Sequence, residues 1–213
     1  MSDLNQQDLD AIRAQLLKAI LRHVPFDGWS AMARDKAASD LDLDHDIAAL
    51  ALPEDKMLDV FYRYVDDRMV DQAGTMEGMR INQMINHMLL TRLDILAPHR
   101  EAVRRAVQMS PLKAGASACF LWRTADLIWK KAGDQAMDYN HYSKRAILSG
   151  IYAATLVVWL QDDSNDKEQT RAFLENRITG VLRFEKAKTH FAQTMNKAPS
   201  LIRFLSRLRY HSQ

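Results

Sequence analysis

The chain has 213 residues, 47% of them hydrophobic and 26% charged, so it can bury a full core, and an intrinsically disordered chain is excluded. With only 7 Gly and 5 Pro it lacks the frequent turns of a β-rich protein, and we expect long helices with almost no strand. The single Cys119 excludes an intrachain disulfide, and the first ten residues have neither an apolar signal core nor a transit-type pattern, which favours a cytoplasmic or already processed protein.

The net charge of +2 is unevenly distributed along the chain. Residues 183–213 contain seven Lys or Arg and one acid, a net charge of +6, which leaves −4 on residues 1–182. This basic end favours an anionic partner, either nucleic acid or lipid headgroups. The longest apolar run, residues 146–160, is shorter than the roughly 20 residues that a membrane span needs. We therefore predict no transmembrane helix.

The first third of the sequence predicts four helices in the order long, short, short, long. Ser30 and Asp44 can cap the second and third helices, and Pro53 suits the first turn of the fourth. This order is typical of the opening of TetR-type proteins. The predicted helices extend from Leu9 past Ile20 to a break at Pro25–Gly28, over 30–38, over 44–50, and from Pro53 through Met69, where Leu58, Phe61, Val65 and Met69 share a face.

The remaining sequence predicts further helices separated by proline and polar breaks. Residues 141–161 are apolar nearly all round, so this helix is expected at the centre of the fold. The other helices are expected at about 77–97, at 98–109, from Pro111 through Lys131, and after a turn at 162–166, with a last break at Pro199.

No common nucleotide-binding, hydrolase or zinc motif is present. A di-iron site in a bundle needs two Glu-x-x-His pairs, and the nearest approximations are Asp42-x-x-His45 and Asp138-x-x-His141. Both use the shorter Asp, and neither lies inside a long core-facing helix. We therefore expect no metal and no cofactor.

The third predicted helix holds the position of a DNA-recognition helix. Residues 45–50 contain no Lys or Arg, and Asp40, Asp42, Asp44 and Asp46 crowd the approach to it. These carboxylates would repel a phosphate backbone. We predict that the helix-turn-helix shape remains without nucleic-acid binding, and the alternative is a TetR-type transcriptional regulator that senses a lipophilic ligand.

The interior is rich in methionine and tryptophan, with eleven Met and four Trp. Methionine adapts to irregular apolar shapes, as a pocket for a long flexible ligand requires, although it is also an ordinary core filler. We predict a cavity between the central helix and a Met-bearing helix. Its expected lipid-binding residues are Met84, Met88, Trp122, Ile147, Ile151, Thr155 and Val158.

The end of the chain has the pattern of a helix that lies in a membrane interface. A packing helix with a solvated basic face is the alternative. The apolar residues of this predicted membrane-binding segment are Leu201, Ile202, Phe204, Leu205 and Leu208, and its cations are Arg203, Arg207 and Arg209.

Residues 126–178 resemble the coenzyme Q biosynthesis accessory protein family, the ninth of the Coq proteins. Over residues 9–100 the resemblance is mainly the TetR-like helical layout. The matching segments are Ala132–Gln135, Asp138–Asn140, Tyr142–Leu148, Ile151–Tyr152, Gln161–Ser164 and Phe173–Arg177.

This resemblance implies an all-α, TetR-like homodimer that holds an isoprenoid or quinone lipid and docks onto a membrane. It further implies that the protein presents a quinone intermediate to the demethoxyubiquinone hydroxylase without catalysing a reaction itself. The expected location is cytoplasmic, peripheral at the inner membrane, or on the matrix side in a eukaryote. The expected parts are a degenerate helix-turn-helix region (1–71), a lipid-binding and dimerisation bundle (72–196) and a C-terminal amphipathic helix (197–213).

By the same resemblance, a patch before and at the start of the central helix would contact the hydroxylase. His141 stands where the family commonly has Trp, so the contact would be weaker or differently specified. A purely structural dimerisation module, with a solid core, is the remaining alternative. The expected patch residues are Asp126, Ile128, Trp129, Asp138, His141, Tyr142 and Arg145.

Overall fold

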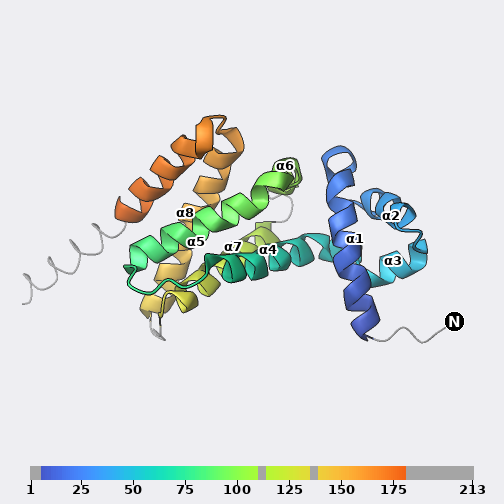
Figure 1. The fold of residues 1–213 in the computed structure, drawn as a ribbon, viewed down its shortest axis with the longest axis horizontal. Coiled ribbons are helices and arrows are strands. Elements are labelled where there is room, and N and C mark those ends of the chain that lie inside the picture. The colour runs from blue at the N-terminus through green and yellow to red at the C-terminus, as the bar shows by residue number, and fades with distance from the viewer. Residues whose placement is uncertain (1–5, 110–113, 135–138, 181–213) are drawn as a thin grey trace, which may run out of the picture.

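A computed structural model describes residues 6–109, 114–134 and 139–180 (Figure 1). Within these ranges the regular structure is entirely helical, which confirms the predicted all-α class. The helices are α1 (Gln6–Asp27), α2 (Ala31–Asp40), α3 (His45–Ala51), α4 (Met57–Ala73), α5 (Ile81–Leu96), α6 (Arg100–Met109), α7 (Ala114–Lys131), α8 (Tyr139–Gln161) and a further helix over 168–180, with 3-10 turns at Glu54–Lys56, Ala97–His99 and Asn165–Lys167.

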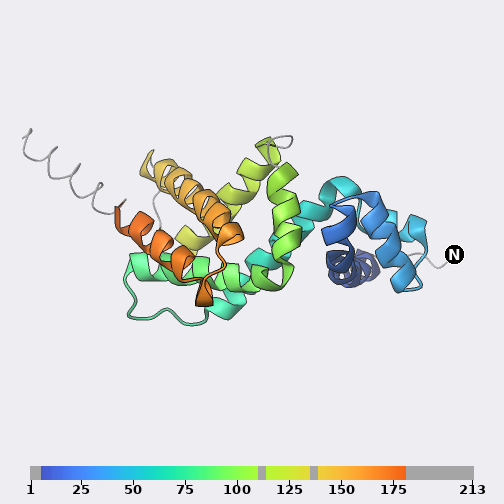
Figure 2. The same cartoon turned by 90° about the horizontal axis from the view of Figure 1, so that it is seen from above.

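Helices α1, α2 and α3 form a unit at one end of the molecule, and α4 leads from this unit into the remaining bundle (Figures 1 and 2). The predicted caps of the short helices are confirmed. Ser30 Oγ accepts a hydrogen bond from the Ala33 N–H at 3.3 Å, and the Asp44 carboxylate accepts from the N–H groups of the first turn of α3. These caps satisfy backbone donors that a helix start leaves unpaired.

Helix α1 ends inside the predicted break at Pro25–Gly28, whereas the predicted start of α5 is wrong by a few residues. Pro25 lies inside α1, which ends at Asp27 before Gly28 adopts a positive φ of 70°. Proline in the last turn removes one hydrogen bond but lets α1 continue to Asp27. The positive φ of Gly28 is incompatible with a right-handed helix, so α1 ends there. Helix α5 begins at Ile81 rather than near 77, because Gly78 has a φ of 78°.

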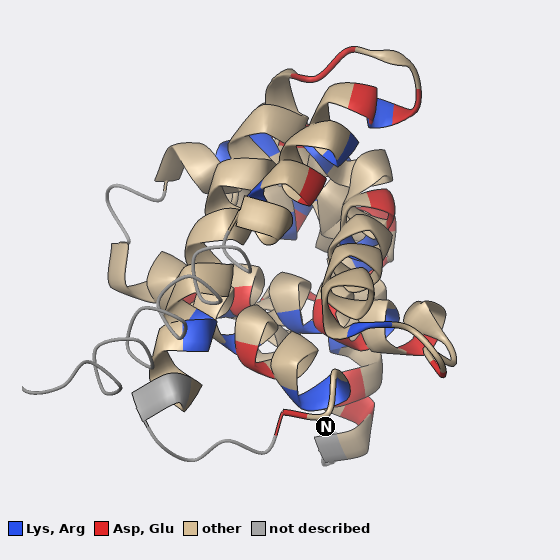
Figure 3. Ribbon diagram, turned by 90° about the vertical axis from the view of Figure 1, so that its left-hand side faces the viewer, with Lys and Arg blue, Asp and Glu red and all other residues tan. Residues whose placement is uncertain are grey.

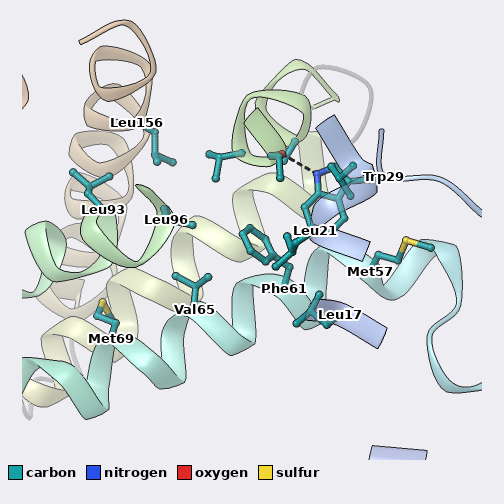
Figure 4. Close-up of a cluster of buried hydrophobic side chains, with 14 of the residues drawn as sticks. Leu17, Leu21, Trp29, Met57, Phe61, Val65, Met69, Leu93, Leu96 and Leu156 are labelled. Atoms are coloured by element: carbon teal, nitrogen blue, oxygen red, sulfur yellow. Dashed lines mark hydrogen bonds between the residues drawn. The ribbon is translucent and has the colours of Figure 1, made fainter. Parts of the chain in front are cut away.

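A shared apolar core joins the N-terminal unit to the bundle (Figure 4). Phe61, Val65 and Met69 are fully buried along one face of α4, as their spacing predicts. Trp29 packs against Phe61 with 5.1 Å between ring centroids, and its Nε1–H donates to the Ala102 carbonyl of α6 at 2.9 Å. This contact fixes the N-terminal unit on the bundle.

The end of α8 is held by charged side chains. Arg100 Nη2 and Arg104 Nη2 donate to the Leu160 carbonyl at 3.0 and 2.8 Å, which satisfies a helix-end acceptor. Beyond it the buried Asp162 carboxylate accepts four hydrogen bonds from Ser164 and Thr170. The turn thereby returns the chain, so that residues 168–180 run beside α8 (Figures 1 and 2).

In the described part of the chain no helix is both long enough and apolar enough to span a membrane.

Candidate functional site

A cavity of about 210 Å³ lies among helices α4 to α8. Most of its lining is apolar, but one end is formed by polar side chains from α4, α5, α7 and α8. The lining residues are Leu58, Tyr62, Arg92, Ala106, Val107, Ser117, Phe120, Leu121, Thr124, Tyr152, Ala153, Leu156 and Val157.

The polar end of the cavity is organised by the buried Arg92 of α5. Its Nε–H donates to the Tyr152 hydroxyl at 2.6 Å, and its Nη1 makes a short ion pair with the Asp66 carboxylate of α4. The guanidinium also lies 5.3 Å from the centre of the Tyr152 ring. Burying a guanidinium is tolerated only when it is paired and hydrogen-bonded, and Asp66 and Tyr152 meet this need.

Asp66 is shared by three donors. Besides Arg92, it accepts from Thr124 Oγ1 at 2.9 Å and from Arg123 Nε at 3.0 Å, both on α7. Arg123 continues to Asp59 of α4 with Nη1 at 2.5 Å. We call Asp59, Asp66, Arg92, Arg123, Thr124 and Tyr152 the buried polar cluster, which cross-links four helices at the end of the cavity.

The cluster shifts the ionisation of its members. Burial opposes the charge of Arg92, but the contacts with Tyr152 and Asp66 hold its pKa above the ordinary value. Burial raises the pKa of the Tyr152 phenol, and Arg92 only partly offsets that rise. Arg92 is therefore a permanent cation and Tyr152 a neutral hydroxyl at physiological pH.

Among the residues that line the cavity, Val157 of α8 is 48% exposed. Arg92, Thr124 and Tyr152, which also line it, are almost completely buried. A second hollow of about 30 Å³ shares Leu58 and other walls with the cavity and extends to Trp29. We call the part of the lining that the buried Arg92, Thr124 and Tyr152 form the closed end of the cavity.

The predicted lipid-binding residues do not line this cavity, and their role stays a prediction. The predicted α8 residues lie on a neighbouring face of the helix, because the cavity is lined by Tyr152, Ala153, Leu156 and Val157 instead. Met88 is fully buried in the core, and Thr155 bonds its own helix at the Ile151 carbonyl. The seven predicted lipid-binding residues that do not line this cavity are Met84, Met88, Trp122, Ile147, Ile151, Thr155 and Val158.

The sequence does contain a signal for the true polar end. Arg92 interrupts an apolar stripe at helical spacing, with Met88, Leu89, Leu93 and Leu96 around it. A charged residue inside such a stripe is buried with a partner or marks a site. On α4, Asp66 likewise interrupts an apolar stripe, between the buried Val65 and Met69.

The α7–α8 hairpin brings together the residues of the predicted docking patch. Arg145 Nε donates to Asp126 at 2.6 Å, and Trp129 Nε1 donates to the Lys144 carbonyl at 3.2 Å. Tyr142 is 61% exposed and stacks on Trp122 with 6.2 Å between ring centroids. Asp138 lies outside the described residues.

Two predicted patch residues face inward. Ile128 is fully buried, and Arg145 is 1% exposed, held by Asp126, Asp134 and the His141 carbonyl. Burial raises the pKa of Asp126, but hydrogen bonds from Lys130 and Arg145 outweigh it and leave the pKa below the ordinary value. Ile128 and Arg145 therefore support the hairpin, while the Tyr142 side chain lies at the surface.

The N-terminal unit carries paired opposite charges. Acidic and basic residues are also interspersed at the opposite end of the molecule, which faces the viewer in Figure 3. Asp40 pairs with His23 at 2.8 Å and with Arg22 at 3.4 Å, and Lys36 pairs with Asp27 at 2.7 Å. Among the described residues no group of three or more His, Cys, Asp or Glu could hold a metal ion. The predicted membrane-binding residues 201–209 lie outside the described residues.

Comparison with a solved structure identifies the fold. A TetR transcriptional regulator from Nitrosomonas europaea superposes with a TM-score of 0.64 and 21% sequence identity, over 80% of this chain and 97% of the regulator. This likeness confirms the predicted TetR-like fold, and at this identity it shows the fold alone.

Sequence comparison identifies the family. The COQ9 family model matches residues 114–185, which include α7 and α8. The ubiquinone biosynthesis protein COQ9 of Xenopus tropicalis is 32% identical over 87% of this chain and 62% of its own length. COQ9-B of Xenopus laevis is 32% identical over 87% of this chain and 67% of its own length. Human COQ9 is 31% identical over 81% of this chain and 58% of its own length. The chain thus spans about three fifths of the first of these relatives, and it belongs to the COQ9 family.

Proposed function

We propose that the chain is a non-catalytic lipid-binding protein of ubiquinone biosynthesis, which holds a polyprenyl quinone intermediate in the cavity among α4 to α8. Its COQ9 relatives are named as mitochondrial ubiquinone biosynthesis proteins, which supports the pathway. The observation that carries the lipid-binding step is the cavity itself, about 210 Å³ with a largely apolar lining. Such a space shields an apolar molecule from water, and the gain scales with the apolar area that it covers.

The intermediate passes from the cavity to a demethoxyubiquinone hydroxylase that docks on the α7–α8 hairpin. Exposed Tyr142, stacked on Trp122, supports this docking surface because aromatic side chains are common anchors of protein interfaces. The protein acts as a homodimer at the surface of a membrane, on the matrix side in a mitochondrion. Residues 201–209 provide the attachment, with their apolar stripe in the lipid and their arginines on anionic headgroups.

Mass spectrometry of lipids extracted from the natively purified protein tests the lipid-binding step. The expected result is a polyprenyl quinone or its precursor at close to one molecule per chain. Detergent-free purification with an unrelated helical protein prepared in parallel is the control. A preparation without any isoprenoid above the control contradicts the proposal.

Liposome flotation tests the membrane attachment. Each fully buried large apolar side chain contributes roughly 1.5–3 kcal/mol, and interfacial burial gives part of this. Serine at Leu201, Phe204 and Leu208 is expected to abolish flotation. Glutamine at Arg203, Arg207 and Arg209 is expected to weaken it only on anionic vesicles at low salt. Unchanged flotation after truncation at Lys197 would place the attachment elsewhere.

A further inference from the structure

The closed end of the cavity offers hydrogen-bond donors, and the carboxylate beside them is already engaged. Both Asp66 oxygens already accept hydrogen bonds, Oδ1 from Arg92 and Thr124 and Oδ2 from Arg123. The Tyr152 hydroxyl accepts from Arg92, and within the described ranges no acceptor takes its own proton. A buried donor without a partner is costly, so a ligand that places acceptor atoms at this end gains stability there.

Two more donors face the same space. Nη2 of Arg92 has no hydrogen-bond partner in the part of the chain that the structure describes, and Arg92 lines the cavity. The Tyr62 hydroxyl likewise makes no hydrogen bond there. Burial raises the pKa of the Tyr62 phenol well above its ordinary value. Tyr152 and Arg92, which line the same cavity, also shift this pKa, Tyr152 upward and Arg92 downward. Tyr62 therefore keeps its proton and remains a donor.

The charges of the cluster are already balanced. Asp59 and Asp66 face Arg92 and Arg123, and Arg63 reaches Asp59 from the solvent side at 2.8 Å. A carboxylate or phosphate at this end would find no excess of buried positive charge, and its desolvation would stay largely uncompensated. The donors therefore fit neutral acceptors, such as carbonyl or ether oxygens.

The cavity volume limits how much of a lipid can enter. A space of roughly 150 Å³ accommodates a benzene molecule, and whole ligands usually occupy roughly 300–1,000 Å³. About 210 Å³ thus holds one substituted ring, or one end of a chain, but not a polyprenyl quinone in full. Tyr62, Phe120 and Tyr152 supply aromatic walls, with 5.0 Å between the ring centroids of Tyr62 and Phe120.

We propose that the quinone ring, and not the isoprenoid tail, occupies the closed end of the cavity, with its oxygens accepting hydrogen bonds from Tyr62, Tyr152 and Arg92. This inference rests on the proposed lipid-binding function and assigns the orientation of the bound molecule. The tail leaves past Val157 on α8. The stored lipid thus hides its reactive ring from water, and delivery to an enzyme requires the ring to withdraw from these donors.

Equilibrium dialysis with three probes of similar alkyl length tests the orientation. Decylubiquinone carries the ring with oxygens, decylbenzene a ring without them, and decanoate an anionic head. The wild-type protein is expected to bind decylubiquinone more tightly than either of the others. Tyr62→Phe removes one hydroxyl and is expected to weaken the binding of decylubiquinone about 3- to 10-fold. The affinity for decylbenzene should stay unchanged. Tyr64→Phe, on the same helix and outside the cavity lining, is the matched control and should change neither.

Infrared spectroscopy gives a readout that a change in packing alone would not produce. The carbonyl stretch of bound decylubiquinone should shift to lower frequency in the wild type and shift less in Tyr62→Phe. Equal affinity of the wild type for decylubiquinone and decylbenzene would leave the lipid site standing and overturn the orientation. Tighter binding of decanoate would also overturn it. Failure of all three probes to bind would contradict the proposed lipid-binding function as well.

Discussion

The N-terminal unit and the cavity-bearing bundle use polar residues in opposite ways. In α1–α3 the charges lie at the surface in pairs such as Lys36–Asp27, where the lysine side chain is half exposed, and the interior is apolar. In the bundle Arg92 and Asp66 are buried beside a cavity. Surface pairs contribute little to stability, whereas a buried pair fixes the helices around it. The TetR-like shape thus comes from apolar packing, and the character of the site comes from the buried polar cluster.

The largest expected effect is the loss of Asp66. Asp66→Ala leaves Arg92 buried without its carboxylate, and we expect the free energy of unfolding to fall by about 3–5 kcal/mol. Urea denaturation followed by circular dichroism measures it. The matched change in the other region, Lys36→Met, breaks an exposed pair and should cost less than about 1 kcal/mol. Equal losses in both variants would remove the distinction between the two regions.

A smaller effect is expected where the two regions meet. Trp29→Phe removes the hydrogen bond from Nε1 to the Ala102 carbonyl and some packing against Phe61, and we expect a loss of about 1–2 kcal/mol. Thermal unfolding should then show the N-terminal unit separating earlier from the bundle. Trp122→Phe, at a half-buried position in α7, serves as the control and should have a smaller effect. An unchanged melting profile in Trp29→Phe would mean that this contact does not couple the regions.

A pH-dependent effect is expected at the turn after α8. Burial raises the pKa of Asp162, but the hydrogen bonds from Ser164 and Thr170 outweigh it and hold the pKa well below the ordinary value. A carboxyl group whose pKa is lower in the folded than in the unfolded state stabilises the fold at pH values above its unfolded pKa of about 4. This stabilisation is lost as the pH falls toward the pKa of the folded state.

The Asp162→Asn variant should therefore lose about 1–3 kcal/mol at pH 7 and show a flatter decline of stability below about pH 4. Urea midpoints measured between pH 7 and pH 3 check this. Asp163→Asn, at a side chain that is 86% exposed, is the control. Parallel pH profiles for the wild type and Asp162→Asn would refute the role of this carboxylate.

The smallest expected effect concerns nucleic acid. Helix α3 carries no Lys or Arg, Asp44 caps its start and Asp46 lies in its first turn, so phosphate contacts are missing. We expect no sequence-dependent shift of duplex DNA in a gel at nanomolar protein, at any salt concentration. A salt-resistant, sequence-dependent shift would instead support the alternative of a transcriptional regulator.

Much of the fold could be predicted from the sequence because helix signals are local. Ser30 and Asp44 mark helix starts, and the spacing of Phe61, Val65 and Met69 marks the buried face of α4. The cavity could not be located in this way. The central helix is apolar on several faces, so periodicity does not tell which face lines a cavity and which packs solidly. Tyr152 and Ile151 differ by one position, and only the packing of α5, α6 and α7 decides between them.

The central claim is that the cavity among α4 to α8 is the lipid site, and native mass spectrometry of two α8 variants tests it most directly. Ala153 lines the cavity, whereas its neighbour Ala154 does not. Ala153→Phe should fill the space and abolish the co-purified lipid, while Ala154→Phe should retain it, with both variants folded by circular dichroism. Lipid retained at wild-type levels in folded Ala153→Phe would contradict the claim and place the lipid elsewhere in the protein.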